Sequence, residues 1–305
     1  MNQPLNTPVL FLIFNRPDTT KRVFESIREA KPSRLYIAAD GPRKGKIGEL
    51  ELCTLTREIT NEVDWNCEVK TLFRENNLGC KVAVSSAINW FFENEEEGII
   101  LEDDCLPNQS FFMFCQTLLN YYRDNEKVMH IGGANFQGGI KRGDGSYYFS
   151  KYNHIWGWAT WKSAWKNYNI SMQIYSPEKT THLLRSIFDT KREITYWEKI
   201  FSDVVAEKIN TWDYQWTYNI WSNNGVAILP NKNLVRNIGF NADATHTASE
   251  DIMSIGNIPL EEIDIIVHPQ TIFVDKEADR YGFNNIFHPS LLKFATKKLL
   301  SLISK

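Results

Sequence analysis

The residues with the clearest chemical potential are three consecutive acids, Glu102, Asp103 and Asp104, called here the acidic triplet. They directly follow the apolar residues 99–101, which have the pattern of a buried strand. Hard divalent cations bind carboxylate oxygens, and diphosphate oxygens often complete their coordination shell. The triplet therefore predicts a cation site that acts on a diphosphate. The alternative is a solvated turn that caps the next helix.

A further acid, Asp213, lies between Trp212 and Tyr214. Aromatic neighbours exclude water, which raises the pKa of a carboxyl group and favours its use as a general base. Asp is also a preferred residue at the start of a helix, and residues 214–222 are expected to be helical. The two roles are compatible, and we expect the base.

Strand-like and helix-like segments alternate through the first half of the chain. Apolar runs and turn residues predict strands at residues 8–14, 34–39, 68–73, 98–101, 128–131 and 226–230. Helical periodicity predicts helices at residues 18–30, 48–61, 79–94, 110–122, 191–209 and 212–222. This order predicts an α/β fold, with a mainly parallel, Rossmann-like sheet flanked by helices on both faces.

Several polar residues follow the predicted strands of this sheet. Asn15 and Arg16 come after the first strand, Asp40 after the second, and the acidic triplet after the fourth. Ligands of open α/β sheets bind outside the carboxyl ends of the strands. We therefore expect these side chains to converge at one edge of the sheet.

Composition excludes some classes of protein. The 305 residues carry a net charge of −3, which argues against a nucleic-acid-binding protein. Five cysteines without a CxxC pair indicate reduced thiols and a cytoplasmic location. The short apolar run near the N-terminus lacks the basic flank of a signal peptide, and no stretch is long enough to span a membrane. Aromatic residues make up 13%, which fits either core packing or a carbohydrate site.

The motifs taken in order resemble a known family. Residues 9–16, Asp40-Gly41, residues 77–80, the acidic triplet and Pro107 with Phe111-Phe112 resemble N-acetylglucosaminyltransferase I in order and spacing. They are also similar to bacterial family-2-like transferases, including those labelled hemolytic-protein-like. The triplet resembles the DxD-type motif of these GT-A-fold glycosyltransferases. The resemblance covers roughly residues 8–250, and it implies inverting transfer of a sugar from a nucleotide-diphosphate donor.

The resemblance also implies roles for individual residues in donor binding. Asp104 corresponds to the ligand of Mn²⁺ or Mg²⁺, with Asp103 near the ribose and Glu102 near the donor sugar. Arg16 corresponds to the arginine that lies against the donor nucleotide, beside Asn15. Asp40 corresponds to the aspartate that reads the uracil edge, which implies UDP; the alternative for residues 40–42 is a plain turn.

A second group of roles concerns catalysis and the acceptor. Asp213 corresponds to the general base of the family, with Trp212 beside it. Trp156, Gly157 and Trp158 resemble a glycine-containing aromatic loop that closes over donor and acceptor, and the alternative is a Trp-rich core helix. His246 corresponds to a C-terminal histidine that some members bring to the metal or the diphosphate.

The chain is divided by these motifs into a catalytic domain, residues 1–250, and a C-terminal extension, residues 251–305. Apolar residues at helical spacing between lysines in residues 289–305 predict an amphipathic helix. Such a helix either contacts an anionic membrane, placing the enzyme at its inner face, or packs on the domain. We expect a glycan or glycolipid acceptor and a role in polysaccharide biosynthesis. The remaining alternatives are a sugar-1-phosphate nucleotidyltransferase, although residues 15–18 lack its glycine-rich loop, and a non-catalytic carbohydrate- or nucleotide-binding protein.

Overall fold

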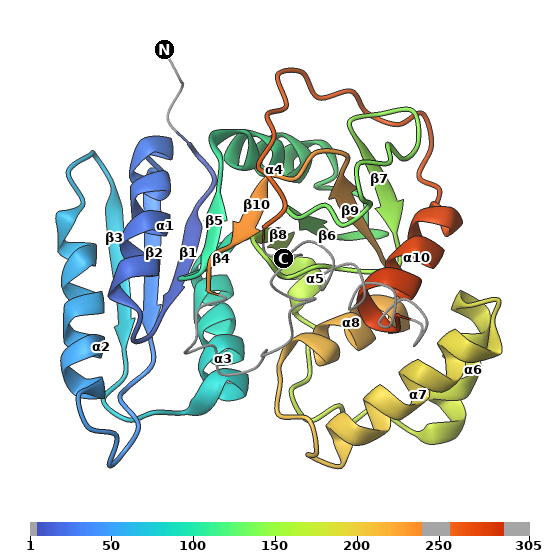
Figure 1. The fold of residues 1–305 in the computed structure, drawn as a ribbon, viewed down its shortest axis with the longest axis horizontal. Helices are drawn as coiled ribbons and strands as arrows, with labels where there is room; N and C mark the ends of the chain where they lie inside the picture. The colour runs from blue at the N-terminus through green and yellow to red at the C-terminus, as the bar shows by residue number, and fades with distance from the viewer. Residues whose placement is uncertain (1–4, 240–256, 290–305) are drawn as a thin grey trace, which may run out of the picture.

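A computed structural model describes residues 5–239 and 257–289, and its centre is an eight-stranded sheet with the order β3-β2-β1-β4-β8-β6-β9-β7 (Figure 1). A second sheet pairs β10 with β5. The strands are β1 (Val9–Ile13), β2 (Arg34–Ala39), β3 (Glu68–Phe73), β4 (Glu97–Glu102), β5 (Cys105–Pro107), β6 (Val128–Gly132), β7 (Tyr147–Ser150), β8 (Trp158–Trp161), β9 (Val226–Pro230) and β10 (Val235–Asn237).

The helices lie on both faces of the large sheet. They are α1 (Pro17–Ala30), α2 (Glu49–Glu58), η1 (Ile59–Glu62), α3 (Gly79–Asn94), α4 (Gln109–Tyr121), α5 (Lys162–Trp165), α6 (Pro177–Ile187), α7 (Lys191–Val205), α8 (Asp213–Ser222), α10 (Lys276–Gly282) and the short helical turn η2 (Phe283–Phe287). Figure 1 shows α6, α7 and α8 gathered on the side of the molecule opposite to α2. The fold class predicted from the sequence, α/β with a mostly parallel sheet flanked by helices, is confirmed.

The direction and order of the strands create a switch point beside β1. β1 pairs in parallel with β2 on one side and with β4 on the other. The chain therefore winds outward in both directions from β1 and β4, and this is where ligands bind in doubly wound sheets. β8 and β7 run antiparallel to their neighbours, so the sheet is mixed beyond β4.

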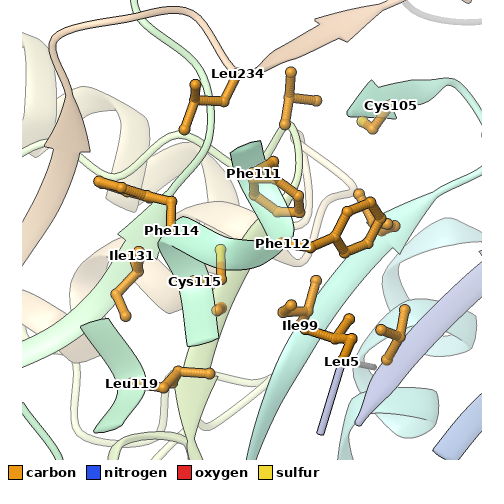
Figure 2. Packing of buried hydrophobic residues seen from close by; sticks show 14 of the residues in the cluster. Leu5, Ile99, Cys105, Phe111, Phe112, Phe114, Cys115, Leu119, Ile131 and Leu234 are labelled. Carbon is orange, nitrogen blue, oxygen red and sulfur yellow. The ribbon is translucent and has the colours of Figure 1, made fainter. Parts of the chain in front are cut away.

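Alternate side chains of β1 enter two different cores. Phe11 packs in the core under α1 and α4, whereas Leu10 packs in the core under α3 and α8. β1 is buried along its whole length, as expected for a strand with helices on both faces. Figure 2 shows part of the first core, where Phe111, Phe112 and Phe114 of α4 belong to the same cluster as Ile99 of β4.

The sequence analysis missed the antiparallel part of the sheet. The segment expected to be an aromatic loop or a core helix contains β8, and Trp158 is one of its strand residues. Its pattern alternates between the two cores: Ala159 and Trp161 enter the first, and Trp158 enters the second. Four residues of alternating pattern are too short to be distinguished from a loop by periodicity alone.

The described part of the C-terminal segment returns to the body of the molecule. Phe149 of β7 bridges to Val274, and α10 follows directly and packs near β7. Phe287 of η2 lies against Tyr152 and Trp197, with ring centroids 4.7 and 5.2 Å apart. The predicted domain boundary at residue 250, and all but the first residue of the predicted helix over residues 289–305, fall outside the described residues. Within the described part of the chain, no helix is both long and apolar enough to cross a membrane.

Candidate functional site

The acidic triplet lies at the carboxyl end of β4, as the sequence predicted. Glu102 is the last residue of β4, and Asp103 and Asp104 form the turn into β5. Leu12 of β1 is in register with Glu102, so the next residues of both strands lie side by side. The backbone N–H of Phe14 donates to Oδ2 of Asp103 at 3.0 Å. This bond fixes the turn against the end of β1.

Arg16 is brought to the triplet by the start of α1. Its Nη1 lies 2.7 Å from Oδ2 of Asp104 and 3.8 Å from Oδ1 of Asp103. Burial of the guanidinium opposes its charge, but Asp103 and Asp104 outweigh this effect and raise the pKa of Arg16. Arg16 and Asp104, which follow different strands in the sequence, therefore belong to one charge cluster.

The cluster remains short of positive charge. Burial, followed by the charges of Asp104, Asp103 and Asp213, raises the pKa of Glu102 well above its ordinary value. Burial, followed by the charge of Asp104, raises the pKa of Asp103 to about 7, although Arg16 opposes this. One guanidinium thus faces three carboxyl groups, and a further cation would stabilise their charged forms.

Asp213 is the first residue of α8, and it lies near the triplet although it is distant in sequence. Burial raises the pKa of Asp213, and a hydrogen bond from the Thr211 hydroxyl partly offsets this effect. The charge of Asp213 contributes to the raised pKa of Glu102, so the two carboxyl groups lie within electrostatic range of each other. Trp212 occupies the position before the helix and makes no side-chain cap. Asp213 is therefore the first residue inside the helix, where the N–H groups of Asp213 and Tyr214 also favour its charged form.

Cys80 shows that the predicted acids share one region. Desolvation, followed by the charges of Glu102, Asp213, Asp40 and Asp104, raises the pKa of the Cys80 thiol to about 12. A single thiol at the beginning of α3 is thus within electrostatic reach of all four acids.

Asp40 ties the end of β2 to the beginning of α3. Its Oδ1 accepts hydrogen bonds from the N–H groups of Gly41 and Leu78, each at 2.9 Å. Its Oδ2 accepts from Nδ2 of Asn77 at 2.9 Å and from the N–H of Gly79 at 3.1 Å. Asp40 is only 8% exposed. The carboxylate therefore satisfies the first N–H groups of α3, a function that the sequence analysis did not predict.

Asn15 turns toward α2 and away from the triplet. Its Nδ2 donates to Oε1 of Glu49 at 3.0 Å. Glu49 is buried and also accepts from Nε of Arg43 at 2.9 Å, and this bond to Arg43 is the main cause that lowers the pKa of Glu49. Asn15 thus supports the loop that follows β2, residues 40–48.

Two of the predicted aromatic residues form part of the core. Trp158 is fully buried and Trp212 is 2% exposed, and their rings stack 5.8 Å apart. Trp158 also stacks on His130, which accepts from the indole N–H of Trp216 at 3.2 Å. This stack supports the beginning of α8, where Asp213 lies.

Trp156 and Gly157 precede β8 and pack against other protein segments. Trp156 is partly buried, with its ring 5.1 Å from that of Phe136. Gly157 has a φ of +63°, and a Cβ there would lie 2.8 Å from Val235 and 3.2 Å from Leu101. A glycine at this position therefore allows close packing between protein segments. The space in which its Cβ would lie is filled by the protein itself.

Three positions near the site were missed by the sequence analysis. Thr211 donates to Asp213, and Tyr168 donates to the carbonyl of Trp212 at 3.0 Å. Gly239 packs so closely on the triplet that a Cβ would lie 2.4 Å from Oδ2 of Asp104. No local pattern marks these residues, because each acts through a partner distant in sequence or through backbone position. His246 lies outside the described residues.

The triplet provides few ligands for a metal on its own. Within residues 5–239 and 257–289, no three His, Cys, Asp or Glu side chains are arranged to hold a metal ion. The chemistry of the donor set nevertheless suits a hard cation, since the available atoms are carboxylate oxygens. Such a cation would take one protein ligand, Asp104, and would need the oxygens of a bound diphosphate to complete its shell.

Comparisons with known proteins do not identify a family for this chain. No protein-family model matches the sequence, and no curated protein matches it. Among solved structures that match, HddC from Yersinia pseudotuberculosis is 10% identical with a TM-score of 0.33, covering 53% of this chain and 80% of that chain. 4-Diphosphocytidyl-2C-methyl-D-erythritolsynthase from Anaerococcus prevotii DSM 20548 is 8% identical with a TM-score of 0.34, covering 64% and 99%. At this level of similarity neither structure assigns an activity to this chain.

Proposed function

We propose that this protein is an inverting glycosyltransferase that moves a sugar from a nucleotide-diphosphate donor to a hydroxyl group of a glycan or glycolipid. The observation that supports it is that the buried Asp213 lies within electrostatic range of Glu102, which ends β4 beside the switch point of the sheet. One acid is available as a base, and a separate charged cluster is available for a diphosphate. Inverting transfer needs both parts, because the acceptor must lose a proton while the leaving diphosphate is stabilised.

In this proposal Asp213 accepts the proton of the acceptor hydroxyl. Burial raises the pKa of Asp213, which makes its carboxylate a stronger base than an exposed one. The hydroxyl of Thr211 donates a hydrogen bond to Oδ1 of Asp213, and the adjacent Trp212 is buried. The backbone N–H groups of Asp213 and Tyr214 also favour the charged form of this carboxylate.

The donor diphosphate is assigned to Arg16 and Asp104. A guanidinium matches phosphate oxygens in geometry and charge, and Arg16 lies at the beginning of α1, where N–H groups also favour anions. Mn²⁺ or Mg²⁺ on Asp104 would neutralise charge on the leaving diphosphate. Asp103 and Glu102 are assigned to the ribose and the donor sugar, and His246 to the metal or diphosphate.

UDP is the proposed nucleotide. The carboxylate of Asp40 already accepts hydrogen bonds from the N–H groups of Leu78 and Gly79. In this proposal the N3–H of uracil binds the same carboxylate as an additional donor. Asn15 is assigned to the same nucleotide through the loop that it supports. A hexosyl or N-acetylhexosaminyl group is the proposed sugar. Trp156 and Gly157 are assigned to the acceptor side, and Trp158 and Trp212 support that side from the core.

Location and pathway class are part of the proposal. Residues 289–305 would hold the enzyme at the cytoplasmic face of an anionic membrane, where lipid-linked glycans are assembled. Sedimentation of the full chain with anionic liposomes tests this, and deletion of residues 289–305 should abolish it. Sedimentation that is equal for both proteins would rule out the anchor.

The proposed activity is tested with purified full-length protein and a panel of nucleotide sugars. We expect UDP-sugars to raise the thermal midpoint in the presence of Mn²⁺, and slow release of UDP from one of them. Parallel reactions with sugar-1-phosphates and nucleoside triphosphates test nucleotidyl transfer. Pyrophosphate release there, without UDP release from any nucleotide sugar, would replace the proposal with a nucleotidyltransferase. Binding without any turnover would indicate a binding protein.

A further inference from the structure

The ion pair between Arg16 and Asp104 has a consequence for the order of binding at the site. Nη1 of Arg16 lies 2.7 Å from Oδ2 of Asp104, close enough for a charge-assisted hydrogen bond. The charges of Asp103 and Glu102 act on the same guanidinium. Arg16 therefore already occupies the place beside Asp104 that a metal ion would need.

The geometry of Asp104 is fixed from the opposite side. Its carbonyl oxygen accepts a hydrogen bond from the N–H of Ile238 at 2.7 Å. A Cβ on Gly239 would lie 2.4 Å from Oδ2 of Asp104 and 3.0 Å from Nη1 of Arg16. The backbone of Gly239 thus packs directly on the pair, which leaves Oδ2 little freedom to turn toward a second cation.

The helix dipole of α1 does not stabilise the charge of the Arg16 side chain. Arg16 precedes Pro17 at the beginning of α1, where the helix dipole disfavours positive charge. The guanidinium is held by carboxylates, and about a third of the side chain is exposed. A bound diphosphate would offer it oxygens of equal chemistry, together with the N–H groups of the helix terminus.

We propose that Arg16 acts as the cation of Asp104 in the free protein, and that it moves to the donor diphosphate when a divalent cation binds together with that diphosphate. This inference rests on the proposed function. It makes the metal and the nucleotide bind cooperatively, because the nucleotide removes the competitor of the metal. A metal ion alone has to displace a guanidinium from a partly buried carboxylate.

The test measures Mn²⁺ binding to the full chain by the loss of the free-ion electron paramagnetic resonance signal, with and without UDP. Arg16→Gln should bind Mn²⁺ without nucleotide about tenfold more tightly than the unmodified protein, because a charged hydrogen bond no longer competes. UDP should strengthen Mn²⁺ binding strongly in the unmodified protein and much less in Arg16→Gln. Asp104→Asn should bind Mn²⁺ poorly in both conditions.

Arg22→Gln is the matched control, since Arg22 is an exposed arginine on the same helix and its loss changes the net charge equally. Suppose that Asp104→Asn weakens Mn²⁺ binding but Arg16→Gln binds Mn²⁺ no better than Arg22→Gln does. Asp104 is then a metal ligand, but the proposed competition between Arg16 and the metal ion is wrong. If Asp104→Asn binds Mn²⁺ with UDP as well as the unmodified protein does, Asp104 is not the ligand and both assignments fall. Arg16→Met replaces Arg16→Gln if thermal unfolding shows that the latter is misfolded.

Discussion

The protonation behaviour of Asp213 and of the acidic triplet depends on the groups that surround each carboxyl. Burial raises the pKa of Glu102, Asp103 and Asp213. The charges of neighbouring carboxylates add to this effect at Glu102 and Asp103, where Arg16 is the basic group that opposes it. An isolated aspartate has none of these properties. At the residue scale, the proposed base and the proposed diphosphate site each depend on partners supplied by other elements.

Replacement of the proposed base should remove turnover and leave donor binding intact. Asp213→Asn keeps the shape of the side chain and loses the proton acceptor, so we expect kcat to fall by about 10²–10⁴. In the unmodified protein, activity should be lost as pH falls through a pKa above that of an ordinary aspartate, because only the carboxylate is a base. Steady-state kinetics and a UDP titration measure both. Lost UDP binding with retained turnover would show that Asp213 belongs to the donor site.

Asp40 supports α3 in the structure, so its removal should affect stability as well as nucleotide choice. Asp40→Ala leaves the N–H groups of Leu78 and Gly79 without their carboxylate acceptor, at a cost of about 1–3 kcal/mol. Asp18→Ala, an exposed aspartate in the first turn of α1, is the control. Chemical denaturation measures the stability. Equal binding of UDP and CDP by the unmodified protein would refute uracil recognition by Asp40.

Glycines next to the ends of β8 and β10 allow these strands to pack closely on their neighbours. β8 enters the sheet between β4 and β6, and the residue before it, Gly157, has a backbone conformation that favours glycine. β10 pairs with β5 and brings Gly239 onto the acidic triplet. At the element scale, two glycines allow the second half of the chain to approach the site formed by the first half.

Gly157→Ala tests this arrangement. The alanine would hold a φ of +63° and place its Cβ 2.8 Å from Val235, so we expect a loss of about 2–4 kcal/mol in the free energy of unfolding. Gly139→Ala is the matched control, because Gly139 has a φ of +82° and no atom within 4 Å of the added Cβ. Its cost should be near 1 kcal/mol from backbone strain alone. Equal losses in the two variants would show that the contact with Val235 is unimportant.

At the β7 edge of the sheet, helix α10 is attached to the rest of the molecule by Asp279. Oδ2 of the buried Asp279 of α10 accepts from the N–H of Lys151 at 3.1 Å, and Oδ1 accepts from the Ser150 hydroxyl at 2.5 Å. Burial raises the pKa of Asp279 to about 7, and these bonds only partly oppose it. The attachment of α10 is therefore sensitive to pH.

The sign of this effect follows from the raised pKa. The folded protein holds the Asp279 proton more tightly than the unfolded chain, so this group stabilises the fold below about pH 4 relative to neutral pH. We expect the stability that it contributes to be lost as pH rises from about 4 to about 7. Asp279→Asn should make the stability less dependent on pH over that range. Denaturation at a series of pH values measures the difference, and parallel curves for both proteins would contradict the assignment.

The sequence by itself determined the parts of the protein that follow from local pattern. Strands β2, β3 and β9 and helix α3 begin and end where the sequence predicted, because apolar runs and helical periodicity are local properties. The acidic triplet was placed at a strand end for the same reason. Only the tertiary structure decided that β8 is a strand, that Arg16 pairs with Asp104, and that Asp213 acts on Glu102. Those contacts join segments distant along the chain, and their energy depends on burial and packing that no single segment contains.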